Sequence, residues 1–313
     1  MEQLVARLRA AGCVFAEDEA RILVEAATSD DVTDDARLEA LVAARVDGLP
    51  LEHLVGWAEL DGRRWGVAPG VFVPRQRSEL LVREAAARAL SLAAAVGAGA
   101  SAGALPGAAS EALSGAEAGP VLLVDLCCGC GALGGAVAAR LLAAGHDVEL
   151  HAADVDPVAV TCAHENLEAL AAEAFAARAA GADRAQPPGR LSAQTYTGDL
   201  GAPLPAEAWG RVDVLVANAP YVPTEAIGMM PPEAREHEPH AALDGGDDGL
   251  AILRRVIDLA PALLRPGGHL LVETGEAQVG AAVGHLEAAG LVPTVLTDDD
   301  LGATALVGTA PLT

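Results

Sequence analysis

The chain has 313 residues, a formal net charge of −24 and a mean hydropathy of +0.32, and 52% of its residues are hydrophobic. This composition predicts a folded chain with ample apolar material for a core, and the acidity counts against a broadly basic surface that binds nucleic acid. No apolar run approaches the ~20 residues that span a bilayer, and Met1-Glu2-Gln3 lacks the basic start of a signal peptide. We therefore expect a cytoplasmic protein with no membrane partner.

The N-terminal part of the chain predicts a separate helical unit. Apolar residues recur at helical spacing in three segments, residues 4–11, 20–27 and 38–46. Residues 58–67 then alternate in polarity around an Asp-Gly pair, which indicates a β-hairpin. We therefore divide the chain into an N-terminal helical domain with a hairpin linker, residues 1–75, and a second domain, residues 76–313.

The second domain begins with a helix and contains two stretches of low complexity. Ser78 is expected to cap a helix that ends near Ala93. Residues 94–119 consist almost entirely of Ala, Gly, Ser, Leu and Glu, and we interpret them as a flexible insertion. Residues 171–189 are similar and are expected to extend a helix into a loop.

Short apolar segments alternate with helical stretches through the rest of the chain, which predicts a parallel α/β sheet. The expected strands are residues 121–126, 148–153, 191–196, 212–217 and 269–273, followed by a terminal pair at 291–296 and 304–308. Because such sheets bind ligands beyond the carboxyl ends of their strands, the residues that follow each strand are the candidate site.

A glycine loop and an acidic residue follow the first two strands. Asp125 lies near the end of the first strand, and the loop after it consists of Cys127, Cys128, Gly129, Cys130 and Gly131. Asp154 follows the second strand, where a carboxylate can accept hydrogen bonds from ribose hydroxyls. The pattern predicts a nucleoside-bearing cofactor, and Asp125 fits equally a cofactor contact or a structural carboxylate. A single C-x-x-C pair without a second one predicts free thiols and no metal.

The most informative residues follow the fourth strand, and they are Asn218, Ala219, Pro220 and Tyr221. An amide nitrogen is a poor nucleophile because its lone pair is delocalised, so an enzyme must position it and accept hydrogen bonds from its NH2 group. The Asn218 side-chain oxygen and the Ala219 carbonyl can be those acceptors, and the Tyr221 ring offers a flat wall. The motif therefore predicts methyl transfer onto a planar nitrogen, with Asn218 bordering cofactor and substrate.

Several segments resemble the HemK/PrmC group of protein-glutamine methyltransferases. The glycine loop resembles the Asp-x-Gly-x-Gly-x-Gly loop of S-adenosylmethionine-dependent methyltransferases, and residues 218–221 resemble their Asn-Pro-Pro-Tyr motif. The other matching segments are residues 51–56, 67–75, 238–246 and 248–250. The resemblance implies a seven-strand Rossmann-like methyltransferase domain with an antiparallel last strand, and S-adenosylmethionine as the cofactor. It also implies a substrate glutamine in a peptide chain release factor or a ribosomal protein.

The same resemblance assigns roles to individual residues. The loop of residues 127–131 would hold the methionine moiety, Asp154 would bind the ribose, and Asp199 with Leu200 would approach the adenine. Residues 218–221 would hold the glutamine. The N-terminal helical domain would help to hold the protein substrate.

Three departures from the family pattern stand at the site. Ala219 replaces the first proline of the motif, which keeps the acceptor carbonyl but removes a ring that fixes φ. This Asn-Ala-Pro-Tyr form resembles a related branch of the group. Cys127 replaces the first glycine of the loop, so the turn should be one that a residue with a Cβ adopts. Residues 76–79 replace the usual Pro-Glu-Thr-Glu run, although Glu79 is kept.

Three alternative functions stay open at this point. Adenine-amino methylation of nucleic acid uses a similar motif, but 20 Lys and Arg against 44 Asp and Glu favour a basic protein partner over nucleic acid as the direct substrate. A non-catalytic module that binds S-adenosylmethionine is compatible with Ala219 and Cys127. A small-molecule methyltransferase would use the N-terminal domain as a lid.

Overall fold

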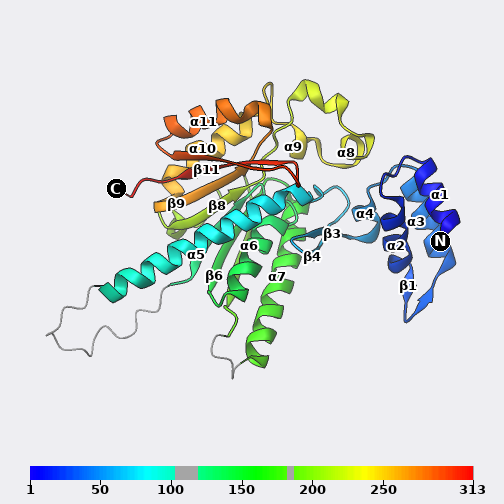
Figure 1. Cartoon of the computed structure of the whole chain (residues 1–313), viewed down its shortest axis with the longest axis horizontal. Helices are drawn as coiled ribbons and strands as arrows, with labels where there is room; N and C mark the ends of the chain where they lie inside the picture. Colours follow the sequence, from blue (N-terminus) through cyan, green and yellow to red (C-terminus); the bar gives the residue numbers. More distant parts are fainter. Residues whose placement is uncertain (103–118, 182–186, 313) are drawn as a thin grey trace.

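The N-terminal helices pack around a small apolar core of their own, at one end of the molecule (Figure 1). The computed structural model describes residues 1–102, 119–181 and 187–312. The elements of this unit are α1 (Glu2–Ala10), α2 (Ala16–Ala26), β1 (Thr28–Ser29), β2 (Val32–Thr33), α3 (Asp35–Val46) and α4 (Leu51–Val55). The three predicted helices are confirmed. The β1–β2 pair and the short α4 were not predicted, because such short elements carry no periodicity.

The predicted hairpin is confirmed and fastens the N-terminal unit to the large domain. It consists of β3 (Trp57–Leu60) and β4 (Arg63–Gly66). The Trp65 ring is 1% exposed and packs so closely on a helix that a Cβ at Gly135 would lie 2.5 Å from it. The Asn166 side chain also accepts from the Gly66 N–H at 2.8 Å and donates to its carbonyl at 2.8 Å. The division at residue 75 remains a proposal.

Seven strands form one sheet in the order β10-β11-β9-β8-β5-β6-β7. Their bounds are β5 (Val121–Leu126), β6 (Val148–Asp154), β7 (Leu191–Thr197), β8 (Val212–Ala217), β9 (Leu264–Glu273), β10 (Val292–Asp298) and β11 (Ala303–Thr309). β11 runs antiparallel to both of its neighbours, and the other pairs are parallel. The predicted strands and the Rossmann-like methyltransferase fold are confirmed. β9 begins earlier than predicted, with a register shift opposite residues 212 and 214.

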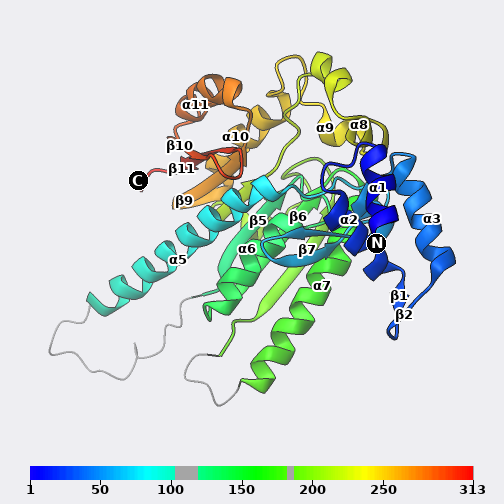
Figure 2. The same cartoon turned by 45° about the vertical axis from the view of Figure 1, so that its right-hand side comes forward.

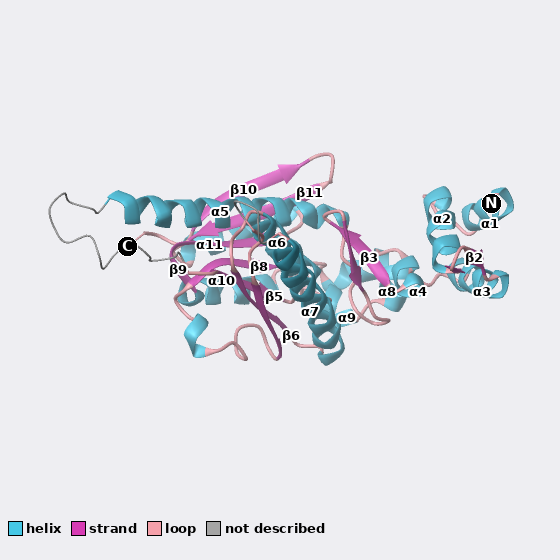
Figure 3. Cartoon of the chain, turned by 90° about the horizontal axis from the view of Figure 1, so that it is seen from below, coloured by secondary structure: helices cyan, strands magenta, loops and turns pink. Residues whose placement is uncertain are grey.

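Helices cover both faces of the sheet (Figures 2 and 3). One face carries α5 (Glu79–Ala102), α6 (Ala132–Ala143) and α7 (Pro157–Ala180), and the other carries α10 (Ala251–Leu263) and α11 (Val279–Ala288). Each face of the sheet has its own apolar core, and alternate residues of β5 point into one or the other. Leu123 packs beneath α5 to α7, whereas Leu122 and Val124 pack beneath α10 and α11. Across the described residues, no helix is long and apolar enough to cross a membrane.

The two low-complexity stretches and the expected cap at Ser78 need correction. Residues 94–102 continue α5, so this part of the expected insertion is helical. Residues 103–118 and 182–186 lie outside the described residues, and α7 extends to Ala180 as expected. Ser78 does not cap α5, because its hydroxyl donates to the Glu273 carboxylate at 2.7 Å. The Ser78 hydroxyl thus binds a side chain that is distant in the sequence instead of a backbone N–H of the helix.

The strand order of the sheet reverses between β5 and β8, which are neighbours in the sheet. From β5 it adds β6 and β7 on one side, and it then returns to place β8 and β9 on the other side. The loops after β5 and β8 therefore diverge to opposite faces and leave a crevice at the carboxyl ends of the strands. Residues 127–130 of the glycine loop border this crevice, and so do Asn218 and Pro220.

We predict that Trp65→Ala lowers the free energy of unfolding by ~3–5 kcal/mol, because it empties a fully packed site between the hairpin and α6. Urea unfolding followed by circular dichroism measures this change. Trp209→Ala is the matched control, because Trp209 is 37% exposed and should cost much less. Equal losses in the two variants would contradict the anchoring role of Trp65.

Candidate cofactor and methyl-acceptor site

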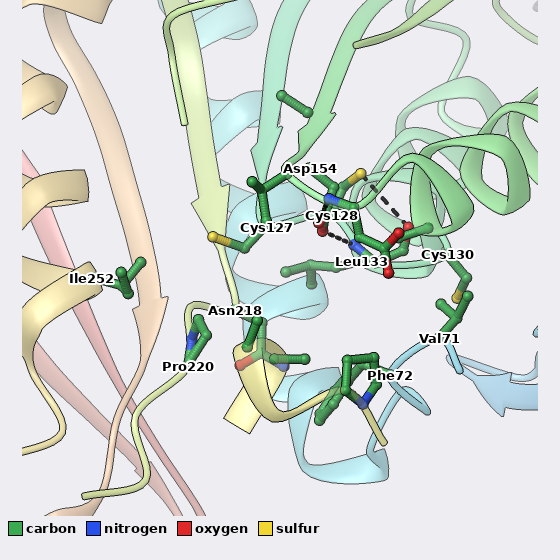
Figure 4. A pocket seen from close by; sticks show the side chains of 18 of the residues that line it. Val71, Phe72, Cys127, Cys128, Cys130, Leu133, Asp154, Asn218, Pro220 and Ile252 are labelled. Atoms are coloured by element: carbon green, nitrogen blue, oxygen red, sulfur yellow. Dashed lines mark hydrogen bonds between the residues drawn. The ribbon is translucent and has the colours of Figure 1, made fainter. Parts of the chain in front are cut away.

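A cavity of about 320 Å³ lies at the carboxyl ends of the parallel strands (Figure 4). Its size is in the range of small-molecule sites. Residues from four strand ends line it, and they include Cys127, Cys128, Gly129, Cys130, Asp154, Asp199, Leu200, Asn218 and Pro220. The structure therefore brings together most of the residues that the sequence singled out. Asp125, Gly131, Ala219 and Tyr221 do not line the cavity.

Asp154 organises the glycine loop. Its Oδ2 accepts a hydrogen bond from the Gly129 N–H at 2.9 Å, and its Oδ1 accepts one from the Asp156 N–H at 3.0 Å. Burial raises the pKa of Asp154, and these backbone hydrogen bonds act in the opposite direction. Each oxygen accepts one of these bonds and has a further lone pair, and Asp154 lines the cavity, so its carboxylate is able to accept from ribose hydroxyls. Asp156 caps α7 as expected, by accepting from the Val158 N–H at 2.8 Å.

Asp125 behaves as a structural carboxylate. It is fully buried, and its Oδ2 accepts from the Gly134 N–H at 2.8 Å in the first turn of α6. Its Oδ1 has no hydrogen-bond partner among the described residues. Burial raises the pKa of Asp125 to about 7. These contacts favour the structural alternative over a cofactor contact. Gly131, at φ +76°, is needed for packing, since a Cβ there would lie 3.0 Å from that of Ala163.

The cysteines make the loop apolar. Cys127 has φ +56°, in the left-handed region, which corrects the expectation of a turn that suits a Cβ. Such a conformation costs a residue other than glycine about 1–2 kcal/mol. All the cysteines are free thiols, and burial raises the pKa of Cys130 to about 12 and that of Cys127 further. Neutral sulfur atoms therefore face the cavity. Among the described residues, no group of His, Cys, Asp or Glu could hold a metal ion.

An ion pair that the sequence did not predict lines part of the cavity. The Arg255 Nη2 donates to the Asp199 Oδ2 at 2.6 Å, and both residues line the cavity beside Leu200 and Ile252. Leu200 takes φ +48° and is buried. Arg255 lies on α10, more than fifty residues after Asp199 in the chain, so only the tertiary fold shows that they meet.

Asn218 and Pro220 also line the cavity, next to the loop after β5. Figure 4 shows them between Ile252 on one side and Phe72 on the other. Ala219 is 2% exposed. Tyr221, two residues later, does not line the cavity, and its hydroxyl donates to the Glu273 Oε1 at 2.9 Å. The flat wall expected of Tyr221 is thus absent from the cavity, where proline and phenylalanine side chains take its place.

Two segments form the outer wall, and the sequence did not assign them to the site. Residues 71–74 follow the hairpin, and residues 239–242 lie at the start of α9 (His240–Leu243). Arg75 joins the two segments by donating to the Glu238 carboxylate, whose side chain is 1% exposed. The side chains that contact the cavity here are apolar: Val71, Phe72, Pro74, Pro239, Ala241 and Ala242. The outer part of the cavity therefore suits an uncharged group.

Comparison with known proteins gives the family. The chain is 30% identical over 273 residues to the release factor glutamine methyltransferase of Geobacter sulfurreducens, covering 87% of this chain and 77% of that protein. It is 33% identical to the same enzyme of Cereibacter sphaeroides, covering 87% and 78%. The chain belongs to the release factor glutamine methyltransferase family. It is thus an S-adenosylmethionine-dependent methyltransferase, and the acidic and apolar lining described above fits that cofactor.

Other comparisons add context. A 4-amino-L-phenylalanine/4-methylamino-L-phenylalanine methyltransferase of Streptomyces pristinaespiralis is 32% identical, covering 80% of this chain and 69% of that protein. A scan against models of protein families found no match. Among solved structures, a human methyltransferase 10 domain containing protein has a TM-score of 0.46 and 12% identity, covering 88% of this chain and 97% of that one. That similarity is too low to add to the assignment, which rests on the sequence relatives and the strand order.

We predict that Asp125→Asn changes how stability depends on pH. The pKa of Asp125 is raised from 3.8 to about 7, so the folded protein retains a proton that the unfolded chain releases. Stability from this group is complete below about pH 4 and is lost as the pH rises to about 7. The variant should therefore gain stability relative to the wild type near pH 8 compared with pH 4, as measured by urea unfolding. Calorimetry with S-adenosylhomocysteine is the control, and a large loss of affinity would instead assign Asp125 to the cofactor.

Proposed function

We propose that the protein is a cytoplasmic enzyme that methylates the side-chain amide nitrogen of a glutamine in a peptide chain release factor. The observation that carries the proposal is the position of Asn218. It lines the same cavity as Asp154, under an outer wall of apolar side chains. An uncharged amide can enter the cavity past this apolar wall without the cost of burying an unpaired charge.

One group of residues at the cavity would bind the cofactor, and another would bind the substrate amide. Asp154 would accept hydrogen bonds from the ribose, and Leu200, Ile252 and the Asp199–Arg255 pair would enclose the adenine. When bound, S-adenosylmethionine supplies an electrophilic methyl group. The Asn218 side-chain oxygen and the Ala219 carbonyl would accept the two hydrogens of the substrate NH2 and direct the lone pair of its nitrogen. A C–N bond forms as the methyl C–S bond breaks, and the nitrogen releases a proton to solvent.

The proposed substrate follows from the names of the relatives and agrees with the charge of the chain. The relatives named above from Geobacter and Cereibacter are release factor glutamine methyltransferases. A net charge of −24 favours a basic protein partner, and it offers no support for nucleic acid as the substrate. A ribosomal protein is the second protein substrate to test. We also propose that residues 1–75 help to hold the protein, since Arg45 donates to Glu233 at 3.0 Å and so joins this unit to α8 (Pro232–His237).

A small amino acid is a second candidate substrate, and one specific observation favours it. The Streptomyces pristinaespiralis relative is named for methylation of an arylamine, which is also a planar nitrogen with a delocalised lone pair. The same acceptors, Asn218 and Ala219, would serve either nitrogen. The two substrates are distinguished by incubating the enzyme with labelled S-adenosylmethionine and either a purified release factor or 4-amino-L-phenylalanine. Label on a glutamine of the release factor supports the main proposal, and label only on the amino acid contradicts it.

We predict that Asn218→Ala abolishes methyl transfer but leaves the cofactor affinity within about threefold, because the variant removes one acceptor of the substrate NH2 group. Single-turnover transfer and calorimetry with S-adenosylhomocysteine measure the two quantities. Gln194→Ala is the control, because this exposed amide on β7 does not line the cavity. An equal loss of affinity and rate would contradict the assignment of Asn218 to the substrate.

A further inference from the structure

Tyr221 is the last residue of the acceptor motif, and it is held at two points. Its hydroxyl donates to the Glu273 Oε1 at 2.9 Å. Its backbone carbonyl accepts from the Gln278 Nε2 at 2.9 Å. The backbone of Gly249 also approaches this carbonyl so closely that a Cβ there would lie 2.3 Å from the oxygen. The phenol and the main chain of one residue are therefore both fixed from outside the loop.

Glu273 is the centre of the contacts at the phenol. This carboxylate ends β9, is 3% exposed, and also accepts from the Arg77 Nε at 2.6 Å and the Ser78 hydroxyl at 2.7 Å. Arg77 donates a second hydrogen bond to the Tyr221 hydroxyl, and its guanidinium lies 5.7 Å from the centre of the ring. Burial next to the Glu273 carboxylate raises the pKa of Tyr221, so the phenol stays neutral.

Gln278 is itself fixed, so it can hold the carbonyl of Tyr221 in one place. Its Oε1 accepts from the Gly275 N–H at 2.9 Å and from the Thr274 hydroxyl at 3.1 Å. Its Nε2 donates to the Asp248 carbonyl at 2.9 Å as well as to Tyr221. The Gln278 amide thus joins the residues after β9 to the loop of Tyr221 and to the loop of Asp248.

The acceptor loop needs such support because it contains one proline where the family motif has two. Ala219 has no ring to restrict its φ, although Pro220 restricts it from the other side. Within the described residues, the Ala219 N–H donates no hydrogen bond, so no hydrogen bond of its own restricts the rotation of Ala219 about φ. Arg77 also stands in the run where the sequence departs from the family pattern.

We infer that Arg77, Glu273 and Gln278 are positioning residues that hold Tyr221, and through it the acceptor groups of Asn218 and Ala219, in place of the missing proline ring. The inference rests on the proposed function, because it requires that the 218–221 loop orients the substrate nitrogen. It assigns none of these three residues a contact with substrate or cofactor, since none lines the cavity.

We call Arg77, Glu273 and Gln278 the clamp on Tyr221. The test removes clamp residues and then restores the proline of the family motif at residue 219. Arg77→Gln and Gln278→Ala should each lower kcat by about 10- to 100-fold, because small misplacements of reacting groups cost that much. The affinity for S-adenosylhomocysteine and the KM for the release factor should change little. Ala219→Pro should recover most of the lost kcat in the Arg77→Gln and Gln278→Ala backgrounds. Arg77→Lys should retain part of the activity.

Control variants separate positioning from folding. Arg83→Gln removes a guanidinium from α5, the helix that follows the 3-10 turn with Arg77. Arg83 donates to the Asp298 carboxylate at 2.9 Å and does not contact the motif, so this variant should leave kcat unchanged. Tyr221→Phe removes only the hydroxyl and keeps the ring, so it provides a milder test if a larger change prevents folding. The inference is overturned if the clamp variants keep the wild-type kcat, or if Ala219→Pro restores nothing in variants that remain folded.

A second readout does not depend on activity. Amide hydrogen exchange over residues 218–222, followed by mass spectrometry, should be about tenfold faster in Arg77→Gln and Gln278→Ala, and slower again after Ala219→Pro. If the wild type does not methylate release factor but the exchange changes as expected, the proposed substrate fails and the clamp stands. If methylation occurs but exchange is unchanged in both variants, the clamp fails and the proposed function stands.

Discussion

Carboxylates at the carboxyl ends of the parallel strands hold the loops that form the cavity. Asp154 at the end of β6 binds the backbone of the glycine loop, and Asp125 near the end of β5 binds the first turn of α6. Glu273 at the end of β9 accepts hydrogen bonds from Arg77, in the 3-10 turn before α5, and from Tyr221 of the acceptor motif. Asp125 and Glu273 are buried and Asp154 is partly buried, and each accepts hydrogen bonds that offset the cost of removing a carboxyl group from water. The loops are therefore specified by contacts that their own sequences do not contain.

Close approach of helix and sheet is the second constraint on the structure. Gly134 and Gly135 leave room on α6 for the Asp125 carboxylate and the Trp65 ring, which would lie within 2.8 and 2.5 Å of an added Cβ. Only 3% of the residues are aromatic, so the core is built mainly from small and branched aliphatic side chains. Trp65 is thus an exception that joins the hairpin to α6. Through Phe72 and Pro74, the same hairpin region also carries part of the cavity wall.

The sequence predicted the sheet well and the details of the site less well, for physical reasons. The strands at 121–126 and 212–217 were predicted to the residue, because fully buried parallel strands are continuous apolar runs between turn residues. Asp154 and Asn218 were predicted as site residues because one ends such a strand and the other follows one, and both line the cavity. The Asp199–Arg255 pair, the outer wall and the Glu273 network were not predicted, because their partners lie about 50 to 200 residues apart in the chain. Ser78 was assigned a local cap for the same reason.

The central claim is that one cavity holds the cofactor at Asp154 and a planar nitrogen at Asn218. A crystal structure with S-adenosylhomocysteine and a glutamine-containing release factor peptide tests it most directly. The account predicts ribose hydroxyls on the Asp154 carboxylate, and the glutamine NH2 group between the Asn218 side-chain oxygen and the Ala219 carbonyl. A glutamine bound elsewhere, or a ribose that does not contact Asp154, would contradict the account.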